Sequence, residues 1–342
     1  MLPTRRIQYG ALQAPDLRRT ARLLETWFHR HQRPLPWRDA YEPYHVWISE
    51  VMLQQTRMEV VLPYFARFLA RFPSLALLAA ATDDEVTAAW SGLGYYRRAR
   101  MLRAGAASVM ERFGGVIPSS VEDLLNIPGI GRYTAGAIAS IAFDGRAPIV
   151  DGNVARVVAR VFGDDGDAWR RAEELVRACK SPRMLNQSVM ELGALICTPR
   201  NPSCLLCPVR GECVAVATGR VDELPRPRDK KAPRQLSIAL YLIRDRKGRV
   251  LMRRESGALM KDLYHLPHGD TSLLTGQPLA PAHRELLGSF KHTVTTRKIE
   301  FTVYAAESRK ARGYEWIDPA RLSELPHPSY VRKALAFRKS EG

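Results

Sequence analysis

The chain has 342 residues, of which 46% are apolar, and its formal net charge is +17. This length predicts two or three domains, and the apolar content is enough for real hydrophobic cores. The charge and an isoelectric point near 10.0 favour a polyanionic partner. The sequence shows neither a signal peptide nor an apolar run of about 20 residues, so we expect no membrane span.

Helical patterns fill the chain up to residue 220. Residues 1–15 are expected to form a frayed leader, and residues 16–31 have the spacing of an amphipathic helix. The helical pattern continues over 44–113, and we expect breaks at Pro63, Pro73 and Gly92. Further helices are predicted at 121–126, 134–143, 153–162, 168–179 and 183–196. Residues 16–220 are therefore predicted to form an all-α region.

A different pattern follows a basic, proline-rich stretch at residues 221–234, which has the composition of an exposed linker. Residues 237–243 and 249–253, separated by a polar turn at 245–248, predict a β-hairpin. Apolar and polar residues alternate over 299–304, which predicts a strand. With a closing helix predicted at 328–337, residues 235–342 are expected to form an α+β domain.

A tight glycine turn precedes the alanine-rich helix predicted at 134–143. Gly129 and Gly131 flank an apolar residue, and glycine allows both a sharp turn and a close backbone approach. The amides of a glycine turn that opens a helix bind anions. We interpret residues 124–143 as a helix-hairpin-helix that holds a DNA phosphate. For the glycine pair alone, a plain turn between helices is the ordinary alternative.

Two carboxylates lie in opposite surroundings. Asp151 stands at the start of a predicted helix, where amides and the helix dipole favour the ionised form; taken alone, it is an ordinary N-cap. Glu50 lies in an apolar helix, so lost solvation should raise its pKa, unless the side chain faces water. One protonated and one ionised acid form the pattern that cleaves a glycosidic bond through an oxocarbenium-like state.

Four cysteines lie within seventeen residues and predict a loop wrapped around a metal centre. Such a set holds either an iron–sulfur cluster or zinc. Zinc usually takes two closely spaced cysteine pairs, and only one such pair is present, so the spacing favours a [4Fe–4S] cluster. The predicted ligands, in a cluster loop at 197–213, are Cys197, Cys204, Cys207 and Cys213.

Taken together, residues 16–338 resemble the MutY-type adenine DNA glycosylases of the helix-hairpin-helix superfamily. The resemblance implies hydrolysis of the N-glycosidic bond of adenine mispaired with 8-oxoguanine or guanine, with the base flipped out of the duplex. The segments that carry it are LPWR (35–38), SEVMLQQT (49–56), GLGYY (92–96), PGIGRYTAGAI (128–138), VDGNVARV (150–157) and the four cysteines.

The resemblance also implies roles for single residues. Glu50 matches the acid that protonates adenine N7, and Asp151 matches the carboxylate that stabilises the sugar cation. Tyr133 and Asn153 match residues that position these two groups. Three further residues match DNA-contacting positions: Arg38 near the base pocket, and Gln55 and Tyr95 at the mispair.

Endonuclease III-like glycosylase/lyases are the alternative within the superfamily. They carry a catalytic lysine where Tyr133 stands here, and the only lysine in residues 1–220 is Lys180. Without an amine nucleophile, Schiff-base lyase chemistry is not expected. We therefore expect a monofunctional enzyme. A DNA-binding protein without catalysis remains the alternative from another class, but it does not explain two acids in opposite surroundings.

The C-terminal domain resembles a Nudix module that lacks the Nudix box. Aligning the box on Arg284 and Glu285 places Gly288 and Ser289 where metal-binding acids belong. We therefore expect a domain that inspects the base opposite adenine rather than a hydrolase. Thr295 supplies the hydroxyl of the family's recognition loop. The expected partner is double-stranded DNA with A:8-oxoguanine or A:G mispairs, bound by a cytoplasmic monomer.

Overall fold

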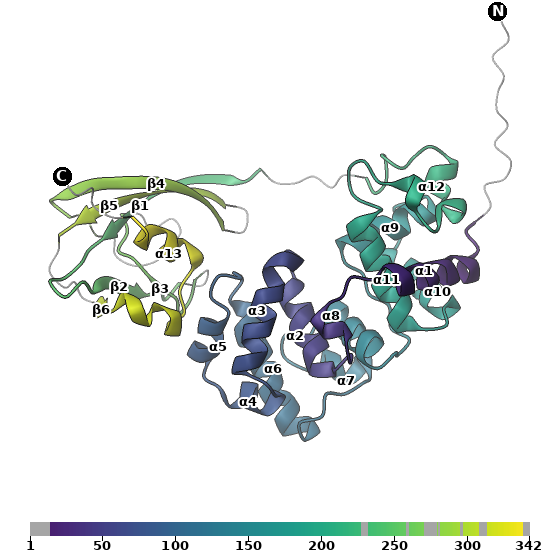
Figure 1. Cartoon of the computed structure of the whole chain (residues 1–342), viewed down its shortest axis with the longest axis horizontal. Coiled ribbons are helices and arrows are strands. Elements are labelled where there is room, and N and C mark those ends of the chain that lie inside the picture. The colour runs from purple at the N-terminus through teal and green to yellow at the C-terminus, as the bar shows by residue number, and fades with distance from the viewer. Residues whose placement is uncertain are drawn as a thin grey trace, which may run out of the picture. The chain divides into compact units, whose positions relative to one another are not determined.

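The computed structural model describes residues 14–226, 232–257, 260–269, 279, 281–294, 297–307 and 313–337. Most of the expected leader and Thr295 lie outside these ranges. The chain divides into two compact units: unit 1 is Met1–Gln54 with Glu111–Asp229, and unit 2 is Gln55–Met110 with Lys230–Gly342 (Figure 1). No helix in the described residues is long and apolar enough to cross a membrane.

Unit 1 is helical, as the sequence predicts. One core of unit 1 gathers apolar residues of α1, α9, α10 and α11, and a π-helical turn at Ile138–Ala142 continues α8. Side-chain caps begin several helices; Asp16, for example, accepts a hydrogen bond from the amide of Arg19 at the start of α1. The helices are α1 (Leu17–His31), α2 (Pro43–Leu53), α7 (Val121–Leu125), α8 (Arg132–Ala137), α9 (Gly152–Phe162), α10 (Ala168–Ala178), α11 (Pro182–Leu195) and α12 (Val214–Ala217).

Unit 2 begins with α3 (Met58–Arg71), α4 (Leu75–Ala80), α5 (Asp83–Ala89) and most of α6 (Arg97–Phe113). The predicted helix break at Pro63 is wrong, because Pro63 lies inside α3. A proline there removes only the bond to the carbonyl of Glu59, close to the helix start. The burial of Val61, Phe65 and Phe68 on one face outweighs that loss.

The described strands of unit 2 form two three-stranded sheets. One has the order β1-β5-β4, with β1 parallel to β5 and β4 antiparallel to it; the other has the order β3-β2-β6. Alternate residues of β1 and β5 pack against α13 in one core. This confirms the α+β prediction. The elements are β1 (Arg234–Leu242), β2 (Val250–Arg254), β3 (Tyr264–His265), β4 (Arg284–Val294), β5 (Arg297–Ala306), β6 (Glu315–Ile317) and α13 (Ser329–Leu335).

The prediction for residues 237–253 is right in its turn and in its two strands, which are β1 and β2, but wrong in pairing these strands as a hairpin. Asp245 and Arg249 close the turn with an amide-to-carbonyl bond of 3.0 Å. Beyond a single bridge, however, β1 and β2 belong to different sheets. The partner of β1 is β5, more than fifty residues away, and local alternation carries no information about so distant a pairing.

Candidate active site

Glu50 is a buried acid with one close polar partner. It lies on α2 among apolar residues and is 4% exposed. The hydroxyl of Tyr133 donates to its Oε2 at 2.6 Å. The pKa of Glu50 is raised to about 7, mainly by burial and also by the charge of Asp151, while the Tyr133 bond and Arg38 oppose this rise. Near neutral pH, this carboxyl is therefore poised between its acid and base forms.

Asp151 is the N-cap of α9, as the sequence predicts. Its Oδ1 accepts from the amide of Val154 at 2.7 Å, and its Oδ2 accepts from Asn153 Nδ2 at 3.3 Å. Both bonds and the helix dipole favour a negative charge. Asp151 is partly exposed, unlike Glu50, so the two acids occupy the contrasting environments expected from the sequence.

Arg156 connects this acid to the cysteine loop. Its Nη2 donates to Asn153 Oδ1 at 2.8 Å and to the carbonyl of Gly193 at 2.7 Å, and its Nε donates to the carbonyl of Cys197 at 2.7 Å. Arg156 is 8% exposed. The Asn153 amide that contacts Asp151 is therefore oriented by a buried guanidinium anchored on the loop.

The hairpin turn lies at the surface between two buried anchors, Ile127 and Ile130. Gly129 has φ +83°, which only glycine adopts freely, whereas Gly131 has extended backbone and open space where a Cβ would point. Gly131 is also the N-cap of α8 and is exposed, and no side chain caps the amides at this helix start. The guanidinium of Arg132 stacks on Trp169, 3.9 Å from the ring centroid.

Close packing brings the hairpin helix to the acid. A Cβ at Gly136 would lie 2.3 Å from the carbonyl oxygen of Pro148, so any larger residue would push α8 away from the segment before Asp151. Gln54 donates to Thr134 Oγ1 at 3.3 Å and ties the end of α2 to α8. These contacts hold Glu50, Tyr133 and Asp151 in one region of unit 1.

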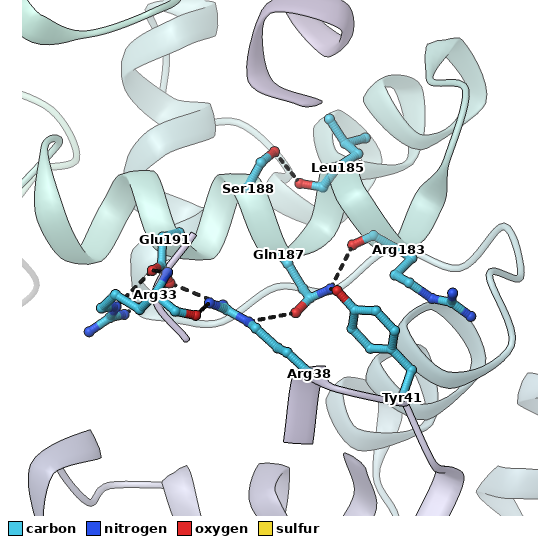
Figure 2. Close-up of polar contacts among 8 residues, drawn as sticks. All are labelled: Arg33, Arg38, Tyr41, Arg183, Leu185, Gln187, Ser188 and Glu191. Atoms are coloured by element: carbon cyan, nitrogen blue, oxygen red, sulfur yellow. Dashed lines mark hydrogen bonds and ion pairs between the residues drawn. The ribbon is translucent and has the colours of Figure 1, made fainter. Parts of the chain in front are cut away.

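Arg38 is fixed in a buried polar network on α11 (Figure 2). It donates to Gln187 Oε1 at 2.9 Å and to Glu191 Oε2 at 3.1 Å. Arg33 also pairs with Glu191, which is 2% exposed. Burial raises the pKa of Glu191, but the two arginines more than compensate and lower it. Arg38 thus lies near Glu50 with its orientation set by α11.

Gln55 and Tyr95 belong to unit 2 and share an uncommon backbone conformation. Both are exposed and have positive φ values, +58° and +50°. Arg98 connects their two loops: its Nη2 donates to Thr56 Oγ1 at 3.3 Å and to the carbonyl of Gly94 at 3.2 Å, and its guanidinium lies 5.4 Å from the Tyr95 ring centroid. Strained surface residues of this kind are common at binding sites.

The four predicted metal ligands line one small cavity whose remaining lining is mostly apolar. Arg160 Nη1 lies 3.4 Å from Cys197 Sγ and is 2% exposed. Burial raises the pKa of Cys207 to about 12 and also raises that of Cys213, so these thiols need a bound cation in order to ionise. A cysteine-ligated centre next to a buried guanidinium fits this donor set. No group of three His, Cys, Asp or Glu suited to a single ion occurs among the described residues.

The side chains that orient the site are not among the residues predicted from the sequence. Arg98 and Arg156 lie three residues from Tyr95 and Asn153, which they contact, whereas Gln187 and Glu191 reach Arg38 across 149 and 153 residues. For Arg156 and Arg160 the sequence does offer a signal, since the two arginines lie four residues apart in a predicted helix. In the structure both are buried. Gln187 and Glu191 have the same spacing on α11, and nothing in their local sequence distinguishes them from surface polar residues.

Two family models match the chain. Residues 48–182 match the HhH-GPD superfamily of base excision DNA repair proteins, and residues 239–337 match the NUDIX domain. Among solved structures, a thermostable thymine-DNA glycosylase aligns with a TM-score of 0.54 at 28% identity, covering 59% of this chain and 97% of that one. An endonuclease III–DNA complex aligns with a TM-score of 0.51 at 22% identity over 60% and 97%, and shows the shared fold.

Several curated relatives are named adenine DNA glycosylase. The relative from Buchnera aphidicola subsp. Schizaphis graminum is 35% identical over 264 residues, covering 75% of this chain and 76% of that protein. The rat relative is 44% identical over 231 residues, covering 61% and 45%, and the human relative is 45% identical over 210 residues, covering 56% and 38%. The chain thus spans less than half the length of these two mammalian relatives.

Proposed function

Because the chain belongs to the adenine DNA glycosylase family, we propose that it hydrolyses the bond between adenine and deoxyribose in mispaired DNA. The observation that carries this proposal is the buried Glu50–Tyr133 pair beside Asp151. A carboxyl with a pKa of about 7 holds a proton at neutral pH and can still release it. The departing adenine needs such a proton at N7.

Asp151 supports the second half of the reaction. Loss of the base leaves positive charge on the sugar, and an ionised carboxylate next to that charge stabilises it. The bonds from Val154 and Asn153 fix the orientation of this carboxylate. Water then completes the hydrolysis. Adenine reaches these groups only after it is flipped from the duplex.

DNA binding is assigned to two surfaces. The uncapped helix start at the exposed Gly131, with Gly129 shaping the turn, suits a backbone phosphate. Gln55 and Tyr95 are exposed, so they are available to fill the space that a flipped base leaves. Arg38, held by Gln187, lines the base pocket near Glu50.

The cysteine loop is proposed to hold a [4Fe–4S] cluster through Cys197, Cys204, Cys207 and Cys213. Such a cluster would cross-link the loop and compensate the negative charge of the four thiolates. Purified protein should be brown, absorb near ~400 nm and contain about four iron atoms per chain, as expected for this cluster type. One zinc atom and no iron would contradict the assignment.

The protein is proposed to be monofunctional, and its C-terminal domain to read the opposite base. Tyr133 occupies the position of the lyase lysine and is engaged with Glu50. A lyase would cleave the strand after base release and form a borohydride-trapped adduct, and neither is expected here. Thr295, proposed to contact 8-oxoguanine, lies outside the described residues. Its test is Thr295→Ala, which should shrink the preference for A:8-oxoguanine over A:G.

The decisive experiment is a single-turnover glycosylase assay with the full chain on A:8-oxoguanine and A:G duplexes. Wild type should release adenine from both. Glu50→Gln should bind equally well and lose at least about 100-fold in rate, the usual contribution of a general acid. Glu122→Gln, on an exposed face of α7, is the matched control and should retain the wild-type rate. Binding without adenine release by wild type would instead support the non-catalytic alternative.

A further inference from the structure

The turn that presents Tyr95 is built from three residues with positive φ. These are Gly92, Gly94 and Tyr95, at +108°, +73° and +50°. A Cβ at Gly92 would lie 2.0 Å from Tyr64 Oη, so only glycine fits there. A turn with this much left-handed backbone persists only where surrounding contacts hold it. The adjacent Tyr96 makes such contacts.

Tyr96 bonds the turn to the C-terminal domain within unit 2. Its hydroxyl donates to the carbonyl of His327 at 2.7 Å and accepts from the amide of Gly92 at 3.3 Å. The amide of His327 in turn donates to Ser91 Oγ at 3.4 Å. Burial raises the pKa of Tyr96 to about 12, so the hydroxyl keeps its proton throughout the working range. Both backbone groups of His327 are thus engaged with the turn.

His327 is a rigid anchor for this contact. It is 1% exposed and lies between two prolines, which restrict the backbone. Its Nδ1 pairs with the carbonyl of Leu325 at 2.8 Å, and Arg332 Nε donates to its Nε2 at 2.8 Å. These partners define a neutral ring protonated on Nδ1. Burial and Arg332 lower the pKa of His327, in agreement with that form.

Further contacts join the same two parts of unit 2. Arg100 donates to the carbonyl of Lys261 at 3.2 Å, and Arg254 forms an ion pair with Asp84. The Tyr96 ring packs against the core of the C-terminal domain. The helices of unit 2 therefore carry both the Tyr95 turn and a docking surface for this domain.

We infer that His327 and Tyr96 form a relay through which the C-terminal domain positions Tyr95 at the mispair. The relay runs from the His327 carbonyl through the Tyr96 hydroxyl to the Gly92 amide, at the opposite end of the turn from Tyr95. This inference rests on the proposed function, because it assigns Tyr95 a place in DNA. It gives the C-terminal domain a second task, besides inspecting the opposite base.

The test is Tyr96→Phe in the full chain, which removes the hydroxyl and keeps the ring. Single-turnover excision from A:8-oxoguanine should fall by about 2- to 12-fold, the usual effect of one hydrogen bond. In a Tyr95→Ala background, Tyr96→Phe should not lower the excision rate further, because a positioning residue acts through the residue that it positions. Tyr330→Phe is the matched control: it removes a buried hydroxyl of the same domain, whose partner among the described residues is Met260 Sδ. It should leave the rate unchanged.

Hydrogen exchange of the 91–96 amides is the readout that does not depend on activity. Exchange should be faster in Tyr96→Phe and in Arg332→Gln, which removes the Arg332 bond to His327 Nε2, and it should be unchanged in Tyr330→Phe. An equal rate loss with and without Tyr95, or an unchanged rate and unchanged exchange in Tyr96→Phe, would overturn the relay. A wild type that releases no adenine would instead refute the proposed function, while exchange would still test the contact.

Discussion

The bond between Tyr133 and Glu50 makes a sharp prediction about pH dependence. Burial raises the pKa of Glu50 to about 7, and the 2.6 Å bond from Tyr133 keeps it from rising further. Tyr133→Phe removes that bond without opening the pocket. The pKa of Glu50 should therefore rise in the variant, and the Glu50 carboxyl should keep the proton that adenine needs up to a higher pH.

The size of the shift follows from the strength of the bond. A hydrogen bond to a charged group contributes about 1.5–3 kcal/mol, and one pKa unit corresponds to about 1.4 kcal/mol. Because the neutral carboxyl also accepts the bond, only part of this energy separates the two forms, and a rise of about one unit is expected. At pH 8 the protonated fraction of Glu50 should then increase from about one tenth to about one half.

The assay is the single-turnover excision rate on A:8-oxoguanine between pH 5.5 and 9.5. The wild-type rate should fall above pH 7 or so, and the fall should begin about one unit higher in Tyr133→Phe. The plateau should be lower in the variant, since the carboxyl is less well oriented. Tyr41→Phe, which removes a hydroxyl bonded to Gln187 instead, is the control and should leave the inflection in place. If the inflection in the pH–rate profile of Tyr133→Phe stays at the wild-type pH or moves to lower pH, this account is refuted.

Three stability predictions follow from buried groups. The pKa of Glu50 is raised in the folded state, so its contribution to the free energy of unfolding is complete below pH 4.5 and is lost as pH rises through about 7. In urea unfolding, Glu50→Gln should therefore be about 3 kcal/mol more stable than wild type at pH 8.5 and equally stable at pH 4. Glu191→Gln leaves two arginines without their buried carboxylate and should lower the free energy of unfolding by about 3 kcal/mol in the same measurement. Arg33→Gln should lower it less, because the Arg33 side chain is 31% exposed. Gly92→Ala should lower the free energy of unfolding by about 1–3 kcal/mol through strain. Adding Tyr64→Phe, which removes the hydroxyl that the new Cβ would meet, should restore part of this stability in thermal unfolding.

The sequence by itself determined which segments are helical and where the chemistry lies. Helix periodicity and caps act within a few residues, so α1, α9 and α11 begin and end close to their predicted limits. The N-cap position of Asp151 and the apolar surroundings of Glu50 follow from the same short-range patterns. Pro63 shows the limit of such rules, because the packing of α3 overrides a local breaker.

Only the tertiary structure decided which distant groups meet. The parallel pairing of β1 with β5 depends on contacts about sixty residues apart, which alternation along one strand does not encode. In the same way, Tyr133 reaches Glu50 across 83 residues, Arg156 reaches the Cys197 carbonyl across 41, and Tyr96 reaches His327 across 231. Side-chain type shows what a residue is able to bond, but the partner is selected by the close packing of whole elements, because a buried polar group must find its hydrogen bond wherever the fold places it.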